Sequence, residues 1–246
     1  MKSILLVLSL LLAAALLSAC LVAPIGDSQT IEGSGTLAEE TRTTSAFDVV
    51  ELSMPGTLHI ESGASVSLRV SAEDNLLPYI ETDTGGGKLQ IRTRPGINVR
   101  ARLPIDFYLT VPSLDGMRTT SSGNIEAADL VTTHFQAAIT SSGSITLQGL
   151  QAETLEVEIS SSGGVTILGG AVESQTIRIS SSGEYLAKQL QSAEASVRLA
   201  SSGTATLRVS DRLDGSLTSS GNLYYLGSPQ VSVNTDSSGR TIQITD

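Results

Sequence analysis

The sequence predicts an all-β chain folded as a parallel β-helix, or β-solenoid, in which a repeat of about 20 residues forms each coil. Three observations predict this fold: a Ser-Ser-Gly motif at regular spacing, alternation of apolar and polar residues on both sides of that motif, and a composition poor in aromatic residues. The 246 residues include 23 Gly, three Phe and no Trp. Such a composition suits narrow, uniform β layers.

The Ser-Ser-Gly motif occurs seven times, at nearly constant intervals along the chain. Its sequence numbers advance by 20 in each of the first four steps and by 18 in each of the last two. Self-similarity at a nearly fixed period is the sequence signature of a repeat architecture. The seven glycines are Gly123, Gly143, Gly163, Gly183, Gly203, Gly221 and Gly239.

The residues around each motif glycine follow one pattern. Every second residue on either side is apolar, which predicts a short strand on each side of the turn, with the apolar side chains on one face. We expect the glycine to supply a positive φ, and the serine hydroxyls to bond nearby backbone or the serines of the next coil. Around Gly163 the apolar residues are Leu155, Val157, Ile159, Val165 and Ile167.

Two architectures produce such strand pairs. Antiparallel hairpins need turn signals at both ends of every strand, whereas the second corner here varies between Asp129–Thr132, Gln148–Gln151 and Leu168–Ala171. One invariant corner and one loose corner favour a parallel coil, in which equivalent residues of successive coils stack about 4.8 Å apart. Stacking at a period of 20 places Glu158 beside Arg178.

Residues 31–246 form one predicted solenoid domain. Its regular repeats occupy 116–246, and fainter copies of the same pattern predict irregular coils over 31–115. These irregular coils are interrupted by excursions at about 64–80 and 92–110. A separate small β domain before residue 116, packed on the repeats, is the alternative.

The N-terminus has the features of an export signal. Lys2 precedes an almost unbroken apolar run, Ile4–Leu17, which is short for a membrane span and ends in small residues. The sequence Leu17-Ser18-Ala19-Cys20 resembles the lipobox of bacterial lipoproteins, in which a diacylglycerol alkylates the cysteine thiol and the preceding peptide is removed. Cys20 is the only cysteine in the chain. An ordinary secretory signal with an incidental cysteine is the alternative.

The resemblance to the lipobox implies a signal peptide over 1–19, a lipid on Cys20 and a tether over 20–30. Two or three acyl chains hold a protein stably at a membrane. Lipoproteins of bacteria with two membranes stay at the inner membrane when Asp follows the cysteine. Leu21 stands there instead, which favours the outer membrane or the cell surface.

Charge argues against nucleic acid as a partner. The segment 1–19 holds one Lys and no acid, so the chain without it has one basic residue fewer, all 25 acidic residues and a formal charge of −11. An acidic domain has no basic field with which to attract phosphates non-specifically.

Several segments resemble the head GIN domain family of bacterial proteins, formerly a domain of unknown function, whose members are named putative autotransporter adhesins. The resemblance covers about residues 31–243 and includes the repeated Ser-Gly turns. Members are exported, often as lipoproteins, and they fold as right-handed β-helices. The resemblance therefore implies a right-handed β-helix in the cell envelope. The segments are Gly33-Ser34-Gly35, Phe47-Asp48-Val49-Val50, Ala72-Glu73-Asp74-Asn75-Leu76-Leu77-Pro78-Tyr79-Ile80, Leu89-Gln90-Ile91 and Val111-Pro112-Ser113-Leu114.

No catalytic constellation emerges from the sequence. The motif serines recur seven times and lack the Gly-x-Ser-x-Gly elbow of a nucleophile, which is typical of a structural turn. His59 and His134 are expected on an outward face and near a loose corner, without metal-ligand spacing. Glu156 and Glu158 share an outward face, where a solvated acidic surface is more typical than a calcium site. Lys88 follows three glycines without the order of a phosphate-binding loop.

We therefore expect a non-enzymatic, lipid-anchored envelope protein that acts as a binding or adhesion scaffold, without cofactor or metal. Its expected partners are the membrane, through the lipid on Cys20, and a surface glycan or envelope protein. Self-association through an exposed terminal coil is a further expectation.

Two other functions remain open at this stage. A β-helix enzyme that cleaves polysaccharides would need clustered acidic and basic residues and sugar-stacking aromatics. The chain offers one aromatic pair for this purpose, Tyr224-Tyr225. A structural or stress-related envelope component without a ligand is the second alternative.

Overall fold

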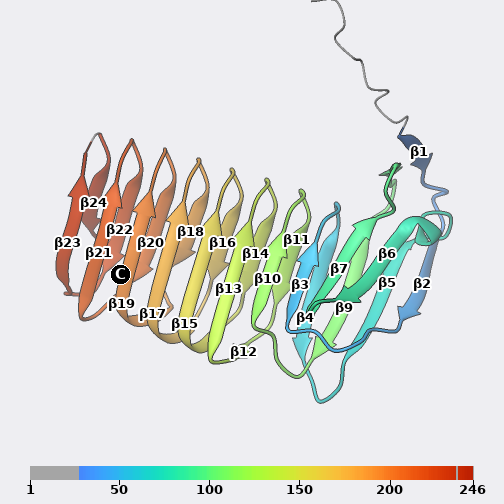
Figure 1. The fold of residues 1–246 in the computed structure, drawn as a ribbon, viewed down its shortest axis with the longest axis horizontal. Helices are drawn as coiled ribbons and strands as arrows, with labels where there is room; N and C mark the ends of the chain where they lie inside the picture. Colours follow the sequence, from blue (N-terminus) through green and yellow to red (C-terminus); the bar gives the residue numbers. More distant parts are fainter. Residues whose placement is uncertain (1–27, 237, 246) are drawn as a thin grey trace, which may run out of the picture.

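The computed structural model describes residues 28–236 and 238–245, so Cys20 and the predicted signal peptide lie outside the described residues. The described chain forms a β-solenoid elongated along one axis (Figure 1). Two sheets of 11 strands each, called here sheet 1 and sheet 2, run along the solenoid, and a two-stranded sheet lies at the N-terminal end. The predicted fold class is confirmed.

Sheet 1 contains, in spatial order, β6 (Ile80–Gly85), β7 (Lys88–Thr93), β3 (Val49–Leu52), β10 (Gly116–Thr119), β13 (His134–Ile139), β15 (Leu150–Ile159), β17 (Gly170–Ile179), β19 (Gln191–Leu199), β21 (Arg212–Leu217) and β23 (Gln230–Thr235), and β12 (Leu130–Val131) pairs with β15.

Sheet 2 contains, in spatial order, β2 (Leu37–Arg42), β5 (Ser67–Glu73), β9 (Asp106–Val111), β4 (Thr57–Ser62), β11 (Asn124–Ala127), β14 (Ser144–Leu147), β16 (Gly164–Ile167), β18 (Glu184–Ala187), β20 (Thr204–Arg208), β22 (Asn222–Leu226) and β24 (Arg240–Gln243). The third sheet pairs β1 (Gln29–Glu32) with β8 (Ile97–Arg100), and a short 3-10 helix, η1, spans Leu77–Tyr79.

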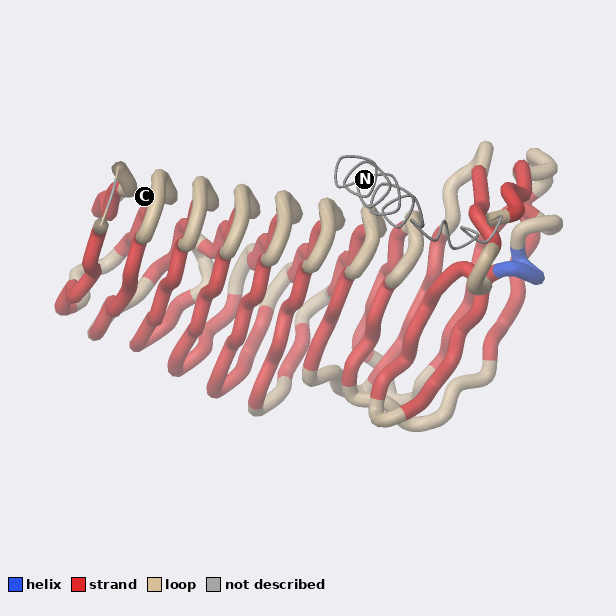
Figure 2. Tube along the Cα trace, turned by 45° about the horizontal axis from the view of Figure 1, so that its top comes forward, coloured by secondary structure: helices blue, strands red, loops and turns tan. Residues whose placement is uncertain are grey.

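Apart from the short additional strand β12, each coil of the regular part contributes one strand to each sheet. A strand of sheet 1 leads through the Ser-Ser-Gly corner into a strand of sheet 2, and the loose corner returns the chain to sheet 1; the Ser-Ser-Gly corners form a row of loops along one edge (Figure 2). Successive coils pair in parallel, so that Ile145 lies opposite Val165 and Val157 lies opposite Ile177. The parallel ladders decide between the two predicted architectures in favour of the stacked coil.

The hydrophobic core fills the space between the two sheets. The apolar residues predicted to share a face point into it, and Val157, Ile159 and Val165 are 0% exposed. The alternate residues of the same strands, such as Glu156 and Glu158, are exposed. Because one coil alone would leave its inward row open above and below, each coil depends on its neighbours for burial.

The N-terminal strands stack in an order that differs from their order in the chain. β3 and β4 pair with β10 and β11 of the first regular coil, and β7 and β9, which come later in the sequence, form the next layer outward. Antiparallel strands then end both sheets. In sheet 1, β6 pairs with β7. In sheet 2, β5 pairs with β9, and β2 pairs with β5. Both sheets therefore continue without interruption from the irregular part into the regular repeats.

The reason why the Ser-Ser-Gly corners require glycine differs from the predicted one. The positive-φ glycines lie elsewhere, for example at Gly56 and Gly170, so the expectation of positive φ at the motif glycines is wrong. A Cβ on Gly163 would instead overlap the carbonyl oxygen of Gly143, and a Cβ on Gly183 would lie 2.9 Å from the carbonyl oxygen of Gly163. Successive coils thus approach so closely at this corner that no side chain fits.

The expected hydroxyl ladder is also wrong. Within the described residues, no hydroxyl of a Ser-Ser-Gly motif forms a side-chain hydrogen bond, and the corner is joined by backbone groups. The amide of Gly164 donates to the carbonyl oxygen of Gly143 at 3.3 Å, and the amide of Glu184 donates to that of Gly163 at 3.0 Å. The serines are small residues on the outer side of the turn, half-buried or exposed.

On the outward face of sheet 1, the two residues predicted to be neighbours, Glu158 and Arg178, lie side by side, but they do not form an ion pair with each other. Glu158 lies opposite Arg178, and Arg178 lies opposite Arg198. The ion pair of Arg178, however, is with Glu156, which lies two residues along the facing strand. Long side chains on a sheet reach diagonal neighbours, so strand register alone does not determine the partner.

The close approach at the corner predicts a specific sensitivity to added atoms. Gly163→Ala should lower the free energy of unfolding by about 1–3 kcal/mol, the usual cost of overpacking, because its Cβ overlaps the carbonyl oxygen of Gly143. Gly164→Ala is the matched control, since its Cβ would meet only the carbonyl oxygen of Glu184 at 3.7 Å. It should be neutral or stabilising by about 0.4–1 kcal/mol. Denaturant titration measures both values, and equal stabilities of the two variants would contradict the steric explanation.

Candidate functional site

A cavity of about 550 Å³, called here the notch, lies along the loose corners where the coil length changes. The coil from Gly203 to Gly221 is two residues shorter than the coil from Gly183 to Gly203. Because of this shortening, β21 begins to pair with β19 only at Glu194, opposite Arg212. Before that point the corner of the following coil still contacts β19, because the amides of Ser210 and Asp211 donate to the carbonyl oxygens of Ser192 and Ala193 at 3.0 Å and 2.9 Å. The notch lies beside this shortened corner.

Four successive coils supply the walls of the notch. Its apolar lining consists of Ala171, Val172, Ala193 and Val209, and its polar lining includes Gln191, Ser192, Arg208, Ser210 and Ser228. The wall nearest the C-terminal coil turns at Gly227, which has a φ of 102°. A Cβ at Gly227 would overlap the carbonyl oxygen of Val209, so this wall requires glycine for both reasons.

A chain of buried polar side chains lies beside the notch. The Tyr185 hydroxyl donates to Gln175 Oε1 at 2.8 Å, and Gln175 Nε2 donates to Ser192 Oγ at 2.7 Å. Ser192 Oγ in turn donates to the carbonyl oxygen of Arg208 at 2.8 Å. Tyr185, Gln175 and Ser192 are 0%, 1% and 5% exposed. Burial raises the pKa of Tyr185, which keeps the phenol a neutral hydrogen-bond donor.

This polar chain occupies positions that are apolar in the other coils. Gln175 lies between Leu155 and Ala195 of the adjacent coils, and Tyr185 lies opposite Ala205, whose small side chain leaves room for the ring. The chain satisfies the carbonyl oxygen at the end of β20, where the coil changes length. Buried carbonyl groups need such partners.

Sequence reasoning missed the notch, although two signals for it were present. The spacing of the motif falls from 20 to 18 after Gly203, and Gln175 stands at an inward position of the repeat. Together these observations could have indicated a polar step in the core.

A second cluster lies on the outward face of sheet 2. Tyr108 of β9 stacks on His59 of β4, with ring centroids 5.1 Å apart, and the guanidinium of Arg69 from β5 lies 4.1 Å from the Tyr108 centroid. His59 Nε2 is 3.2 Å from Asp106 Oδ1, and His59 Nδ1 is 3.4 Å from Glu126 Oε2. His59 thus lies on the outward face, as predicted. Each ring nitrogen of His59 therefore faces a carboxylate oxygen.

The other residues singled out in the sequence lie apart from the notch. His134 is exposed at the start of β13, with Nδ1 2.7 Å from Thr154 Oγ1. Lys88 Nζ is 2.8 Å from Glu51 Oε2. Hydrogen bonds from Lys88 and neighbouring polar side chains outweigh the effect of burial and lower the pKa of Glu51. His134 and Lys88 thus each contact a side chain on a neighbouring strand, which indicates a structural role.

Within residues 28–236 and 238–245, no group of three or more His, Cys, Asp or Glu is arranged to hold a metal ion. No helix in the same part of the chain is long and apolar enough to cross a membrane.

Two of the segments that carry the family resemblance, Gly33–Gly35 and Ala72–Ile80, meet at the N-terminal end, where Glu73 lies 0% exposed. Its carboxylate accepts hydrogen bonds from the backbone amides of Gly35 at 2.5 Å, Arg102 at 2.8 Å and Leu103 at 3.4 Å. Burial by itself would raise the pKa of Glu73, but the three amide donors hold this pKa below its ordinary value. The carboxylate therefore ties together three separate stretches of chain.

The neighbouring polar residues complete this N-terminal clasp, which we define as Gly33–Gly35 with Glu73–Asn75. The Asn75 side-chain amide donates to the carbonyl oxygen of Glu32 at 2.8 Å and accepts from the amide of Ser34 at 2.9 Å. A Cβ on Gly33 would overlap the Glu73 carboxylate. These motif residues have a structural role, because each one bonds to or makes space for another part of the clasp.

The fold and its surface define a β-solenoid that presents two long polar sheet faces and a preformed cavity at its loose corners. The chain matches the family described as putative auto-transporter adhesin, head GIN domain, over residues 46–229, and it belongs to this family. A search of curated proteins gave no significant match.

Solved structures share the whole fold at low sequence identity. A protein from Bacteroides fragilis, named a putative adhesin, superposes with a TM-score of 0.79 at 20% identity, covering 87% of this chain and 100% of that one. A protein from Parabacteroides distasonis, named a putative lipid binding protein, gives 0.73 at 20% identity, covering 88% and 100%. A putative adhesin from Parabacteroides merdae gives 0.68 at 17% identity, covering 88% and 100%.

The hydrogen-bond chain beside the notch predicts coupled effects of substitution. Gln175→Leu should lower the free energy of unfolding by about 1–3 kcal/mol, because it leaves the buried hydroxyl of Tyr185 without its acceptor. Tyr185→Phe should then cost less in the Gln175→Leu background than in the parent, since that hydroxyl no longer has a partner to lose. Denaturant titration of the parent, both single variants and the double variant measures the coupling. Strict additivity would contradict a connected chain.

The clasp predicts an acid-sensitive N-terminal end. The pKa of Glu73 is lower in the folded than in the unfolded chain. Its carboxylate therefore stabilises the fold at pH values above 4.5, the ordinary pKa of a glutamate. This stabilisation is lost as the pH falls through the folded-state pKa. Glu73→Gln should lower the melting temperature by several degrees at about pH 7, and less at about pH 3. Exposed Glu158→Gln is the control and should leave both melting temperatures unchanged. A Glu73 effect that is independent of pH would count against this role.

Proposed function

We propose that the chain is a lipid-anchored, non-enzymatic protein of the cell envelope whose sheet faces bind a partner, as an adhesion scaffold does. The observation that carries the proposal is the pair of 11-stranded sheets, which arrange outward side chains in continuous rows. One such row of sheet 1 passes through Glu156, Thr176, Ser196 and Asp214 on successive strands. Ladder hydrogen bonds fix the spacing within such a row at about 4.8 Å.

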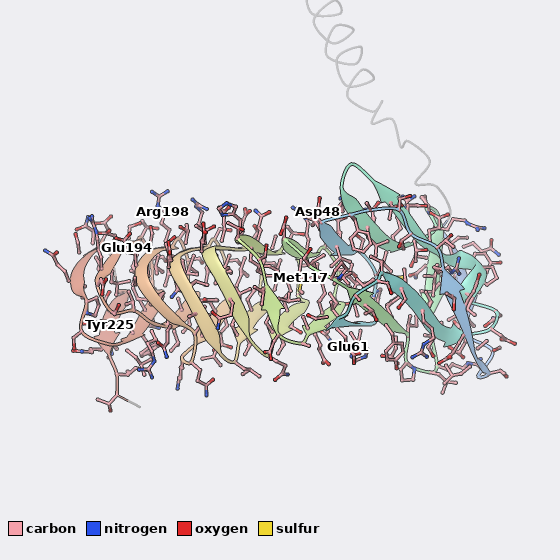
Figure 3. All side chains as sticks on the ribbon, turned by 90° about the horizontal axis from the view of Figure 1, so that it is seen from below. Asp48, Glu61, Met117, Glu194, Arg198 and Tyr225 are labelled. Atoms are coloured by element: carbon pink, nitrogen blue, oxygen red, sulfur yellow. The ribbon has the colours of Figure 1, made fainter. Side chains whose placement is uncertain are left out.

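Rows of this kind suit a partner that is itself repetitive. The outward residues of sheet 1 combine hydroxyls with charges of both signs, and the side chains of Arg198 and Glu61 lie on opposite faces of the solenoid (Figure 3). A polymer with a repeating polar unit can form the same contact at several coils, and weak contacts of this kind add up along a rigid surface. A surface glycan or a repetitive envelope protein is therefore the proposed partner.

The anchoring part of the proposal rests on the sequence. Cys20 follows an apolar export segment in a lipobox-like context, and the first described strand begins at Gln29, nine residues later. Two or three acyl chains on Cys20 would hold the solenoid at the membrane, and Leu21 favours the outer membrane or the cell surface.

The names of the relatives support binding rather than catalysis. The family name and the name of the Bacteroides fragilis protein refer to adhesion, and the name of one Parabacteroides distasonis protein refers to lipid binding. Both terms concern envelope components, which agrees with the proposed location.

Protease shaving of intact cells tests the location, with lysed cells as the digestion control. The parent protein should be digested on intact cells, and the Cys20→Ala variant should leave the membrane fraction, because the lipid attachment site is gone. Protection of the parent until lysis would remove surface exposure from the proposal. A Cys20→Ala variant that stays as membrane-bound as the parent would remove the lipid anchor.

Binding to isolated envelope polysaccharide tests the sheet face. Ser196→Lys places a bulky charge in the middle of the sheet 1 row, and Ser182→Lys adds the same charge at a Ser-Ser-Gly corner, where Ser182 is exposed. The parent and Ser182→Lys should sediment with the polysaccharide, whereas Ser196→Lys should bind several-fold more weakly. Equal losses for both variants would indicate a charge effect without a specific face.

A further inference from the structure

We propose that the notch binds a small single-chain amphiphile, with the alkyl part inside the notch and an uncharged, hydroxyl-bearing head at its rim. This site lies along the loose corners, away from the rows of the sheet faces. The inference is therefore independent of the lipid on Cys20 and of the proposed adhesion.

The notch has the dimensions of a small-molecule site. Its volume of about 550 Å³ falls within the roughly 300–1,000 Å³ that is usual for ligand pockets. Residues of β17, β19 and β20 and of the corners after β20 and β22 form its walls. Ladder hydrogen bonds between coils fix these strands, so the cavity does not depend on a mobile loop.

The inner wall of the notch favours an alkyl group. Val209 and Val172 are 0% and 6% exposed, and the methyl groups of Ala171 and Ala193 extend the same apolar lining. The buried polar group at this wall, the Ser192 hydroxyl, already accepts and donates hydrogen bonds within the chain. A polar ligand group placed there would lose water without gaining a partner, whereas an alkyl group gains by leaving water.

The rim of the notch favours an uncharged polar head. Gln191, Ser210 and Ser228 are exposed there and offer a side-chain amide, the hydroxyl of Ser228, and the hydroxyl oxygen of Ser210 as an acceptor. The charged groups nearby already have local contacts: the Ser210 hydroxyl donates to the Asp211 carboxylate at 2.6 Å, and Arg208 Nε donates to a backbone carbonyl of the preceding coil at 3.0 Å. The formal net charge of −10 further disfavours an anionic head.

The buried hydrogen-bond chain keeps the notch open in the absence of a ligand. Gln175 and Ser192 both contact the carbonyl oxygen of Arg208, at 3.4 Å and 2.8 Å, and so fix the end of β20 at the step between coils. A preformed pocket avoids the cost of ordering its walls on binding.

Calorimetric titration with n-octyl β-D-glucoside, below the concentration at which it forms micelles, tests the inference. The protein is the full chain with Cys20→Ala, which removes only the lipid attachment site. We expect saturable binding of one octyl glucoside per chain. n-Hexyl β-D-glucoside should bind on the order of tenfold more weakly, because each buried methylene contributes about fourfold in affinity.

Two substitutions in that background localise the site. Ala193→Leu fills the notch and should weaken octyl glucoside binding at least tenfold. Glu153→Leu adds the same side chain at the equivalent exposed position two coils earlier and should change binding less than twofold. If Ala193→Leu does not fold, as judged by its melting curve, Ala171→Leu fills the same cavity from another strand.

Three results would overturn the inference. The first is the absence of saturable octyl glucoside binding to the parent, and the second is equal binding to the parent and to the notch-filling variant. The third is a ligand preference that does not match an uncharged amphiphile. Glucose binding as tightly as octyl glucoside would indicate a sugar site, and sodium octanoate binding more tightly would indicate an anion site.

Discussion

The close approach of successive coils at the Ser-Ser-Gly corner is the constraint on which the rest of the structure depends. The corner leaves no space for a Cβ, so the motif glycine fixes where each coil turns. The turn position sets the phase of the strands on both sides, and a slip of one residue would move every inward side chain to the outer face. The uniform core, the parallel ladders and the outward rows all follow from a turn that repeats in register.

The notch shows what happens when this regularity changes at the other corner. The Ser-Ser-Gly corner keeps its geometry while the loose corner shortens by two residues, so the mismatch appears entirely on the loose side. An apolar core cannot satisfy the strand-end carbonyl that the mismatch leaves at Arg208. Gln175 and Ser192 supply that function, and Tyr185 completes the chain of hydrogen bonds. Polar residues inside the solenoid therefore mark an irregularity of its backbone.

The sequence predicted the repeat, the parallel stacking and the inward rows, because period-two alternation around a fixed glycine depends on local chemistry alone. It did not predict why the glycine is needed, since a positive φ and a lack of space give the same residue choice. Nor did it predict the stacking of β7 and β9 outside β3 and β4, because sequence periodicity does not record which strands pair across a long separation. His59 was placed correctly on an outward face, whereas its contacts with Tyr108 and two carboxylates depend on that same non-sequential pairing.

The antiparallel closure of the N-terminal end suggests the order in which the molecule folds. By the end of β9 all strands of the closed end have been synthesised, and every later coil needs only the coil before it as a template. A chain whose N-terminus emerges first can therefore fold coil by coil, in the order in which its residues emerge. Lengthening the protein by duplicating a regular coil would extend this process without disturbing its starting point.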